Sequence, residues 1–339
     1  MVWRIPAGYR VREAALDDVG AVVELTNACS RELLGVCTRS VEDQRADWQS
    51  PAFDPQRDVR VVLAPDTSII GYADVWDVDE PHVRIHSWGR VHPDHRARGI
   101  GSSLLRWIER RASESVSLAP AGSRVCLYQS VFEQDADAQD LLKQADFKLS
   151  RVYSRMVVTM DMAPPAPSWP DGVRVRPYSG RDLAATVQAV QSAFRDHWGY
   201  VEACFEDELK QWEHWTTAYE DFDPSLWFLA TAESTGEIAG VVLGWPKTPE
   251  DPEMGWVEVL GVVRSWRRRG LAVALLQHAF SEFYRRGNRR VGLGVDAASL
   301  TGATRLYERA GMKTVRRTLS YEKELRPGKD LSRRDLVGS

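Results

Sequence analysis

The sequence predicts an α/β protein built from two tandem copies of one domain, each with a mixed sheet flanked by helices. Three observations support this fold class. Strand-like apolar runs alternate with segments of helical periodicity, short motifs recur in the same order in both halves, and a proline-rich break lies near the middle of the 339 residues.

The break is the segment Ala163–Pro170, which holds four prolines in eight residues. Proline lacks a backbone N–H and has a fixed φ, so such a segment cannot join a helix or a central strand. It is typical of a stiff, extended linker. We therefore expect an N-terminal domain at 1–162, the linker at 163–170, a C-terminal domain at 171–326 and a tail at 327–339.

Three pairs of motifs define the repeat. The pairs are Gly8–Arg12 with Gly172–Arg176, His95–Gly101 with Trp266–Ala272, and Leu141–Phe147 with Leu306–Met312. The two members of these pairs lie 164, 171 and 165 residues apart, respectively. Such nearly constant spacing is hard to obtain by chance. The first pair is followed in each half by a polar turn with an aspartate, Asp18 or Asp182, and then by an apolar-periodic helix. The chain is therefore a duplication with small insertions.

The second copy illustrates the expected order of elements. Apolar runs bounded by turn residues predict strands at 173–177, 226–232, 238–245, 255–263 and 290–295. Apolar residues at helical spacing predict helices at 180–197, 202–219, 271–286 and 299–310. A hairpin-like end is expected around Ser320–Glu324.

Composition limits the function classes. The formal net charge is −4, so no global attraction to nucleic acid is expected. The four cysteines form no CxxC pair, and no apolar stretch reaches 18 residues. The first residues lack the apolar run of a signal peptide. We expect a cytoplasmic protein without a metal site and without nucleic-acid or membrane partners.

A glycine-containing turn follows a strand in both copies and opens a helix. Its pattern is Arg-x-x-Gly-x-Gly/Ala, and its residues are Arg96, Gly99 and Gly101 in the first copy and Arg267, Gly270 and Ala272 in the second. Glycine allows close approach of the backbone, and the first helical turn leaves N–H groups unpaired at the positive end of the helix dipole. Both features favour a pyrophosphate site. The alternative is an ordinary connection with solvated arginines.

These segments, Val91–Gly101 and Val262–Ala272, resemble motif A of the GNAT (Gcn5-related N-acetyltransferase) superfamily, and the tandem arrangement resembles its mycothiol synthase branch. The resemblance implies a splayed sheet and acetyl-CoA as the cofactor, with pyrophosphate on the turn and pantetheine along the preceding strand. In the second copy the implied binding residues are Leu260, Gly261, Val262, Arg267, Arg268, Arg269, Gly270, Leu271, Ala272, Val273 and Arg305. In the first copy they are Val91, Arg96, Ala97, Arg98, Gly99, Ile100, Gly101 and Ser102.

The resemblance also implies an acid, because the departing thiolate of CoA benefits from a proton. Such families often use a tyrosine on the short helix after the fifth strand, which corresponds here to Tyr307. A phenol stays protonated at neutral pH and can donate. The alternative is a tyrosine packed against the sheet. The first copy has Leu142 at this place, so the chemistry is assigned to the second copy and the first is expected to be non-catalytic.

Glu258 is the candidate base, and it corresponds to Ser87 in the first copy. It alternates with apolar neighbours, so it either points into the cleft or faces solvent. The resemblance implies an Asn at the start of the Tyr307 helix, where this chain has Ala298–Thr301. It also implies a substrate-binding acid at the position of Trp256 in mycothiol synthases, so a different acceptor is expected.

The first two helices of the second copy are rich in aromatic and acidic residues. They carry Phe194, Trp198, Tyr200, Phe205, Trp212, Trp215 and Tyr219, interspersed with Asp196, His197, Glu202 and Glu206. Such residues suit an amine by cation–π and carboxylate contacts, or they pack a core. We expect acetyl transfer to a small-molecule primary amine, by a monomer or homodimer. The alternatives are a peptide or protein N-terminus as acceptor and a non-catalytic acyl-CoA-binding protein.

Overall fold

The computed structural model describes residues 3–299 and 302–334, and it falls into two units. Unit 1 contains the chain up to Arg151 together with Thr318–Leu331. Unit 2 contains Val152–Arg317 and the tail from Ser332. The expected domains, 1–162 and 171–326, therefore differ from the two units by their last strands, since each half of the chain supplies one strand to the unit of the other half.

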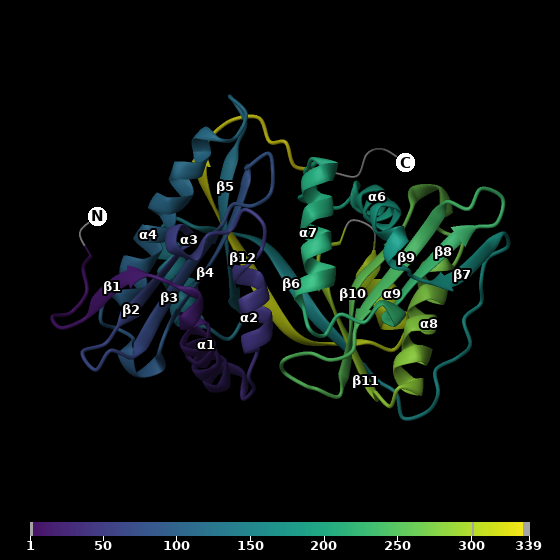
Figure 1. The fold of residues 1–339 in the computed structure, drawn as a ribbon, viewed down its shortest axis with the longest axis horizontal. Coiled ribbons are helices and arrows are strands. Elements are labelled where there is room, and N and C mark those ends of the chain that lie inside the picture. Colours follow the sequence, from purple (N-terminus) through teal and green to yellow (C-terminus); the bar gives the residue numbers. More distant parts are fainter. Residues whose placement is uncertain (1–2, 300–301, 335–339) are drawn as a thin grey trace. The chain divides into compact units, whose positions relative to one another are not determined.

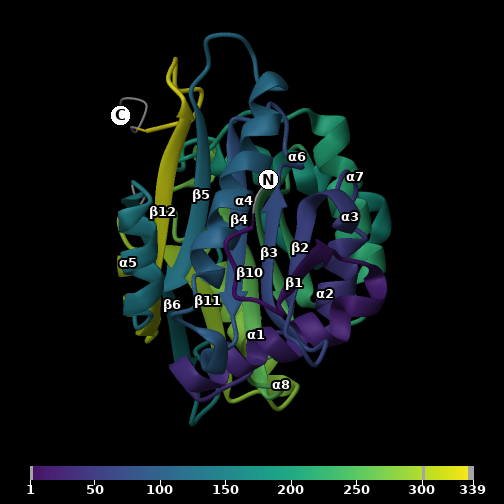
Figure 2. The ribbon, with the colours of Figure 1, turned by 90° about the vertical axis from the view of Figure 1, so that its left-hand side faces the viewer.

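The sheet of unit 1 has strands in the order β1-β2-β3-β4-β5-β12. They are β1 (Arg10–Glu13), β2 (Val59–Leu63), β3 (Ile69–Trp76), β4 (Arg84–Val91), β5 (Val125–Phe132) and β12 (Lys313–Arg326). Neighbours are antiparallel except for β4 and β5, which are parallel because a helix connects them. From Thr318 to Arg326, β12 pairs with β5, and Figure 2 shows these two strands side by side.

Helices cover both faces of this sheet. They are α1 (Val19–Leu34), α2 (Val41–Trp48), α3 (Pro55–Asp58), α4 (Ile100–Glu114) and α5 (Ala136–Gln144). Two successive residues of β3 show the layering: Tyr72 packs in one apolar cluster with α1 and Trp48, whereas a Cβ on Gly71 would lie 3.3 Å from Ile100 of α4. Successive strand residues point to opposite faces, so α1 and α4 lie on opposite sides of the sheet.

Unit 2 repeats this sheet, in the order β7-β8-β9-β10-β11-β6 (Figure 1). Its strands are β7 (Val173–Pro177), β8 (Trp227–Ala232), β9 (Ile238–Trp245), β10 (Met254–Val262), β11 (Arg290–Asp296) and β6 (Lys148–Thr159). Strands β10 and β11 are parallel, and Tyr153–Thr159 of β6 pairs antiparallel with β11. The predicted fold class, two tandem α/β domains with mixed sheets, is confirmed.

The helices of unit 2 are α6 (Leu183–Phe194), α7 (Phe205–Ala218), α8 (Leu271–Arg285) and α9 (Ala303–Arg309). Helices α6 and α7 pack on one face of the sheet and α8 packs on the other. The tryptophans at the first of these faces form a core cluster, in which Trp212 and Trp215 contact Trp227 at ring-centroid distances of 5.8 and 5.9 Å. Core packing is therefore the role of these two residues.

The repeat extends to details of conformation. Gly8 and Gly172 both adopt positive φ, +86° and +74°, just before the first strand of each unit. The aspartates after these strands form equivalent ion pairs, Arg12 with Asp18 and Arg176 with Asp182, each at 2.7 Å.

Two expected elements were wrong in detail. The helix expected at 299–310 begins at Ala303, after Gly302 in a left-handed conformation. Ser299 therefore does not cap it, and Leu300 and Thr301 lie outside the described residues. The hairpin-like end is instead the single 14-residue strand β12, whose second part pairs with β5.

Candidate functional site

The turn between β10 and α8 is open at the helix N-terminus. After one 3₁₀ turn, Arg264–Trp266, the chain takes positive φ at Arg268 (+62°) and Gly270 (+84°). Gly270 is the N-cap and no side chain caps the helix, so the N–H groups of its first turn lack intrahelical acceptors. A Cβ at residue 270 would meet nothing within 4 Å. The backbone is thus arranged as an anion site, and its residues fit a pyrophosphate.

The equivalent turn of unit 1 has the same backbone but a different neighbour. Ala97 and Gly99 have φ of +58° and +76° and precede α4. The N-terminal segment runs beside this turn: Ser103 Oγ donates to the Arg4 carbonyl at 2.7 Å, and Arg98 donates to the Tyr9 hydroxyl at 2.7 Å. The Arg4 carbonyl oxygen lies 3.4 Å from where a Cβ on Gly99 would stand. Both turns are exposed, and the turn of unit 2 is the less crowded of the two at its N-cap glycine.

The first arginine of each motif holds the turn against a helix. Arg267 donates to Asp196 at 2.8 Å, to the Ala193 carbonyl at 2.9 Å and to the Val262 carbonyl at 3.1 Å. In unit 1, Arg96 pairs with Glu32 of α1 at 2.6 Å. The sequence analysis did not predict this ion pair, although Asp196, two residues after the end of α6, could have been proposed as a partner of Arg267.

Two further arginines of the second turn face solvent. Arg268 and Arg269 are exposed, and the Arg269 guanidinium lies 4.8 Å from the Trp266 ring centroid. Arg305 is exposed on α9. These side chains keep donors available for phosphate, in contrast to the first arginine of the motif.

Strands β10 and β11 part halfway along their length. Their pairing joins Met254–Val257 to Arg290–Leu293 and then stops, whereas β10 stays paired with β9 as far as Val262. The β11-facing edge of β10 therefore carries unpaired backbone groups across Leu260–Val262. Such an edge fits an extended ligand with amide groups, as pantetheine is. Unit 1 has the same opening, because β4 pairs with β5 only over Arg84–Ser87.

Glu258 lies at a bulge at the point where the strands part. The register of β10 against β9 shifts between Val257 and Val259, so Glu258 is the extra residue. In unit 1, β4 pairs with β3 without a shift, and Ser87 is buried with its hydroxyl donating to the Tyr128 carbonyl at 3.2 Å. The bulge gives unit 2 a carboxylate where unit 1 has an internally bonded serine.

Two influences act on the Glu258 carboxylate. Its side chain is solvent-accessible, yet the surrounding protein desolvates the carboxylate and raises its pKa. The indole N–H of Trp256 donates to Oε2 at 2.6 Å, and this bond opposes the shift. A carboxylate that is reachable from solvent and has a raised pKa is suited to accept a proton.

Tyr307 packs on the α8 face of the sheet and is 8% exposed. It belongs to the apolar cluster that contains Leu271 and contacts Leu260 and Val262. Burial raises the pKa of Tyr307 to about 12, so the phenol stays protonated. Among the described residues, none forms a hydrogen bond with its hydroxyl. The equivalent Leu142 is also buried.

The other polar candidates have structural partners. Asp196 is committed to Arg267, and His197 stacks on Phe194 at a centroid distance of 4.5 Å. Burial lowers the pKa of His197. These two residues therefore lack the arrangement of an amine-binding pair.

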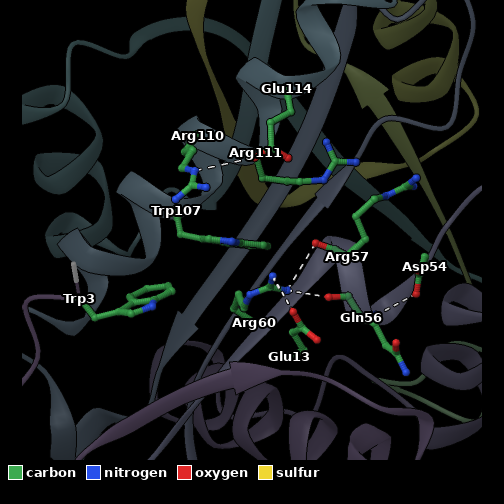
Figure 3. A pocket seen from close by; sticks show the side chains of 10 residues that line it. All are labelled: Trp3, Glu13, Asp54, Gln56, Arg57, Arg60, Trp107, Arg110, Arg111 and Glu114. Carbon is green, nitrogen blue, oxygen red and sulfur yellow. Dashed lines mark hydrogen bonds and ion pairs between the residues drawn. The ribbon is translucent and has the colours of Figure 1, made fainter. Parts of the chain in front are cut away.

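A cavity of about 520 Å³ in unit 1 lies away from the turn (Figure 3). It is lined by the second half of α4, from Trp107 to Glu114, and by residues of α3 and β2. Its arginines already have partners: Arg57 and Arg111 both bind Asp58, and Arg60 lies over Trp107 at 5.1 Å. Charge in this cavity is balanced internally, so it is a poor phosphate site.

Comparisons with known proteins agree with this geometry. The model of the acetyltransferase (GNAT) family matches residues 21–147 and 187–312. The mycothiol acetyltransferase of Streptomyces avermitilis is 31% identical over 268 residues, which cover 78% of this chain and 79% of that protein. The mycothiol acetyltransferase of Thermobispora bispora is 32% identical over 237 residues, which cover 65% of this chain and 70% of that protein.

Solved structures show the same architecture. A GCN5-related N-acetyltransferase from Sphaerobacter thermophilus is 36% identical, with a TM-score of 0.78, and 96% of this chain and 98% of that chain are covered. A tandem GNAT protein of the clavulanic acid biosynthesis pathway is 16% identical, with a TM-score of 0.70 and coverage of 95% and 100%; it supports the fold alone.

In the part of the chain that the structure describes, every helix is too short or too polar to cross a bilayer. Members of the matched family use a CoA-linked acyl donor, and the uncapped turns and parted strands of both units fit such a ligand. The family model matches both halves of the sequence, and relatives match across the linker. The chain belongs to the acetyltransferase (GNAT) family and is a tandem N-acetyltransferase.

Proposed function

We propose that unit 2 transfers an acetyl group from acetyl-CoA to a primary amine of a small molecule. The observation that carries this proposal is the bulge at Glu258, which presents a carboxylate of raised pKa where β10 and β11 part. Unit 1 has the same opening but a buried serine in this position, so it is the accessory unit.

Acetyl-CoA, when bound, supplies an acetyl group activated as a thioester. The pyrophosphate would be held by the first-turn N–H groups of Leu271, Ala272 and Val273. Arg268, Arg269 and Arg305 would add charge, and the open edge over Leu260–Val262 would hold the pantetheine. Arg267 acts by fixing the turn to α6. In unit 1 the equivalent contacts would come from Val91 and from Ala97–Ser102.

Two residues manage protons. Glu258 accepts a proton from the amine, directly or through water, and its raised pKa brings its basicity closer to neutral pH. Tyr307 holds a proton at its phenol oxygen, because its pKa of about 12 keeps it protonated. It is the donor for the departing sulfur. General acid and base catalysis are each worth about 10²–10⁴-fold.

The acceptor class follows from the relatives and from one substitution. Mycothiol acetyltransferases at 31–32% identity act on a small molecule, which favours a small amine over a peptide. Trp256 stands where the resemblance implies a substrate-binding acid, and its N–H is already bonded to Glu258. The acceptor therefore differs from theirs in the group that this position would contact.

Turnover with a panel of primary amines tests the proposal, with the released CoA thiol as the readout. The panel includes the acceptor of mycothiol acetyltransferases, other small amines and short peptides with free N-termini. We expect a small amine to give the highest kcat/KM, and Glu258→Gln to lower kcat by about 10²–10⁴-fold. Preference for peptides, or wild-type kcat in Glu258→Gln, would contradict it.

A further inference from the structure

We propose that Trp256, covered by Arg155 and seated on Gly292, is the positioning residue for the Glu258 carboxylate. The inference rests on the proposed function, in which Glu258 is the base. It makes β6, a strand from the first half of the chain, part of the support of the catalytic unit.

The indole fixes the carboxylate by one short bond. Trp256 Nε1 lies 2.6 Å from Glu258 Oε2. Glu258 is a bulge residue, so the strand ladder does not itself fix its direction. A rigid ring with a single N–H donor can supply this direction, provided that the ring itself is held in place.

A glycine of β11 gives the indole its seat. A Cβ on Gly292 would lie 2.8 and 2.9 Å from two ring carbons of Trp256, closer than real Cβ contacts allow. A Cβ on Gly294, two residues further along the same face of the strand, would lie 4.0 Å from the ring, which is ordinary contact. Glycine in a strand often marks such a close approach, and here the approaching group is the Trp256 ring.

Arg155 lies over the ring. Its guanidinium carbon lies 4.4 Å from the Trp256 centroid, within cation–π range. Glu250 holds this arginine at 3.3 Å and also binds Arg316 at 3.1 Å, and the three side chains are 13–15% exposed. Arg155 belongs to β6 and sits opposite Gly294 in the sheet. The ring thus contacts both a strand of the second half and a side chain of the first half.

Other charged groups near β10 lie at the ends of its neighbours. Helix α6 and strand β9 carry no charged side chain. Strand β11 has Arg290 and Asp296 at its two ends. Helix α8 has His278, whose ring packs on Phe228 at 4.5 Å, and Glu282 and Arg285, which pair with each other at 2.7 Å. The Trp256 N–H bond is accordingly the polar contact that favours the charged form of Glu258, and desolvation opposes it.

The first test is the pH profile of kcat/KM in Trp256→Phe, measured on the full chain with the amine found in the acceptor panel. Phenylalanine keeps an aromatic ring and removes the N–H. The acidic limb should move to higher pH by about half to one unit, while the plateau at high pH falls less than in Glu258→Gln. Arg155→Met should move the limb in the same direction, because the ring loses its cover.

The second test uses a matched pair of glycines. Gly292→Ala should displace the indole and shift the acidic limb as Trp256→Phe does. Gly294→Ala, the same change on the same face of the same strand, should leave the limb where it is in the wild type. Thermal unfolding of both glycine variants shows whether they fold. If Gly292→Ala does not fold, Trp256→Phe remains as the test.

The outcomes separate this inference from the proposed function. If Glu258→Gln keeps wild-type kcat at every pH, Glu258 is not the base and the proposed function loses its carboxylate. If Glu258→Gln is impaired but Trp256→Phe has the wild-type acidic limb, the positioning role is wrong and the base remains. If the acidic limb shifts in Trp256→Phe but not in Arg155→Met, Arg155 has no part in positioning the carboxylate.

Discussion

At the scale of single residues, the two copies differ at the two positions to which the proposed proton transfers are assigned. Where unit 2 has Glu258 at a bulge and Tyr307 on α9, unit 1 has Ser87 in a regular strand and Leu142. Tyr307 and Leu142 are both buried, at 8% and 2% exposed, so the site accepts an apolar side chain. Packing alone therefore does not require the tyrosine hydroxyl.

Replacing Tyr307 by Phe tests this role. The ring and nearly all its volume remain, so stability should change little. Loss of the proton donor should lower kcat by about 10²–10⁴-fold, with acetyl-CoA affinity nearly unchanged. Steady-state kinetics and calorimetry measure the two effects, and Tyr284→Phe, at a half-buried tyrosine of α8, is the control. A kcat near that of the control would show that Tyr307 has only a packing role.

His86 gives unit 1 a pH-dependent stability. Its ring stacks on Tyr128 at 5.4 Å, and burial lowers the pKa of His86 to about 4. In the unfolded chain the His86 imidazole takes up a proton near pH 6.5. The stability that the buried, neutral imidazole contributes is therefore complete above pH 6.5 and is lost as the pH falls towards 4. Between pH 7.5 and 5 the loss should be about 2 kcal/mol.

Urea denaturation at these two pH values measures the difference. His86→Phe keeps a ring in the stack and has no proton to bind. The variant should therefore lose about 2 kcal/mol less than the wild type between pH 7.5 and 5. Equal losses in both proteins would show that His86 is not the group responsible.

At the scale of elements, the turns were predictable and the bulge was not. A glycine between an apolar run and a segment of helical periodicity predicts a strand–turn–helix unit. Gly270 and Gly99 do have positive φ. The bulge at Glu258 leaves no mark in the residue types, because it depends on how β10 registers against β9. Alternate glycines at 292 and 294 were a visible signal of close approach, but sequence alone does not say which ring approaches.

Introducing a negative charge at each of the two turns tests whether unit 2 alone carries out catalysis. Gly270→Glu places a carboxylate and a strained left-handed residue at the proposed pyrophosphate site, so turnover should fall at least about 100-fold through weaker acetyl-CoA binding. The equivalent Gly99→Glu carries the same strain in unit 1 and should leave most turnover intact. Kinetics at saturating amine, with thermal unfolding of both variants, measure this. Equal losses would assign catalysis to both units.

At the scale of the whole chain, the exchange of strands is the feature that the repeat did not reveal. The motifs predict two consecutive domains, and sequence spacing places Lys148–Thr159 with the first and Lys313–Arg326 with the second. In the structure, Tyr153–Thr159 pairs with β11 and Thr318–Arg326 pairs with β5. Strand partners are set by long-range pairing, which periodicity does not encode.

Splitting the chain in the linker tests this exchange. Residues 167–339 alone lack β6, leave the edge of β11 unpaired and lose Arg155. They should be insoluble or inactive when produced alone. Co-production with residues 1–166 should restore soluble protein and acetyltransferase activity, since each fragment holds the strand that the other needs. Activity of 167–339 alone, equal to that of the full chain, would refute the dependence.

The exchange also bears on how the protein is made. The first half of the chain is synthesised before the second, yet the partner of β5 is Thr318–Arg326, which follows all the other strands of both units in the sequence. During synthesis the edge of β5 therefore stays unpaired until the strands of unit 2 have been made. The sheet of the first half is completed only after the strands of the second half have been synthesised.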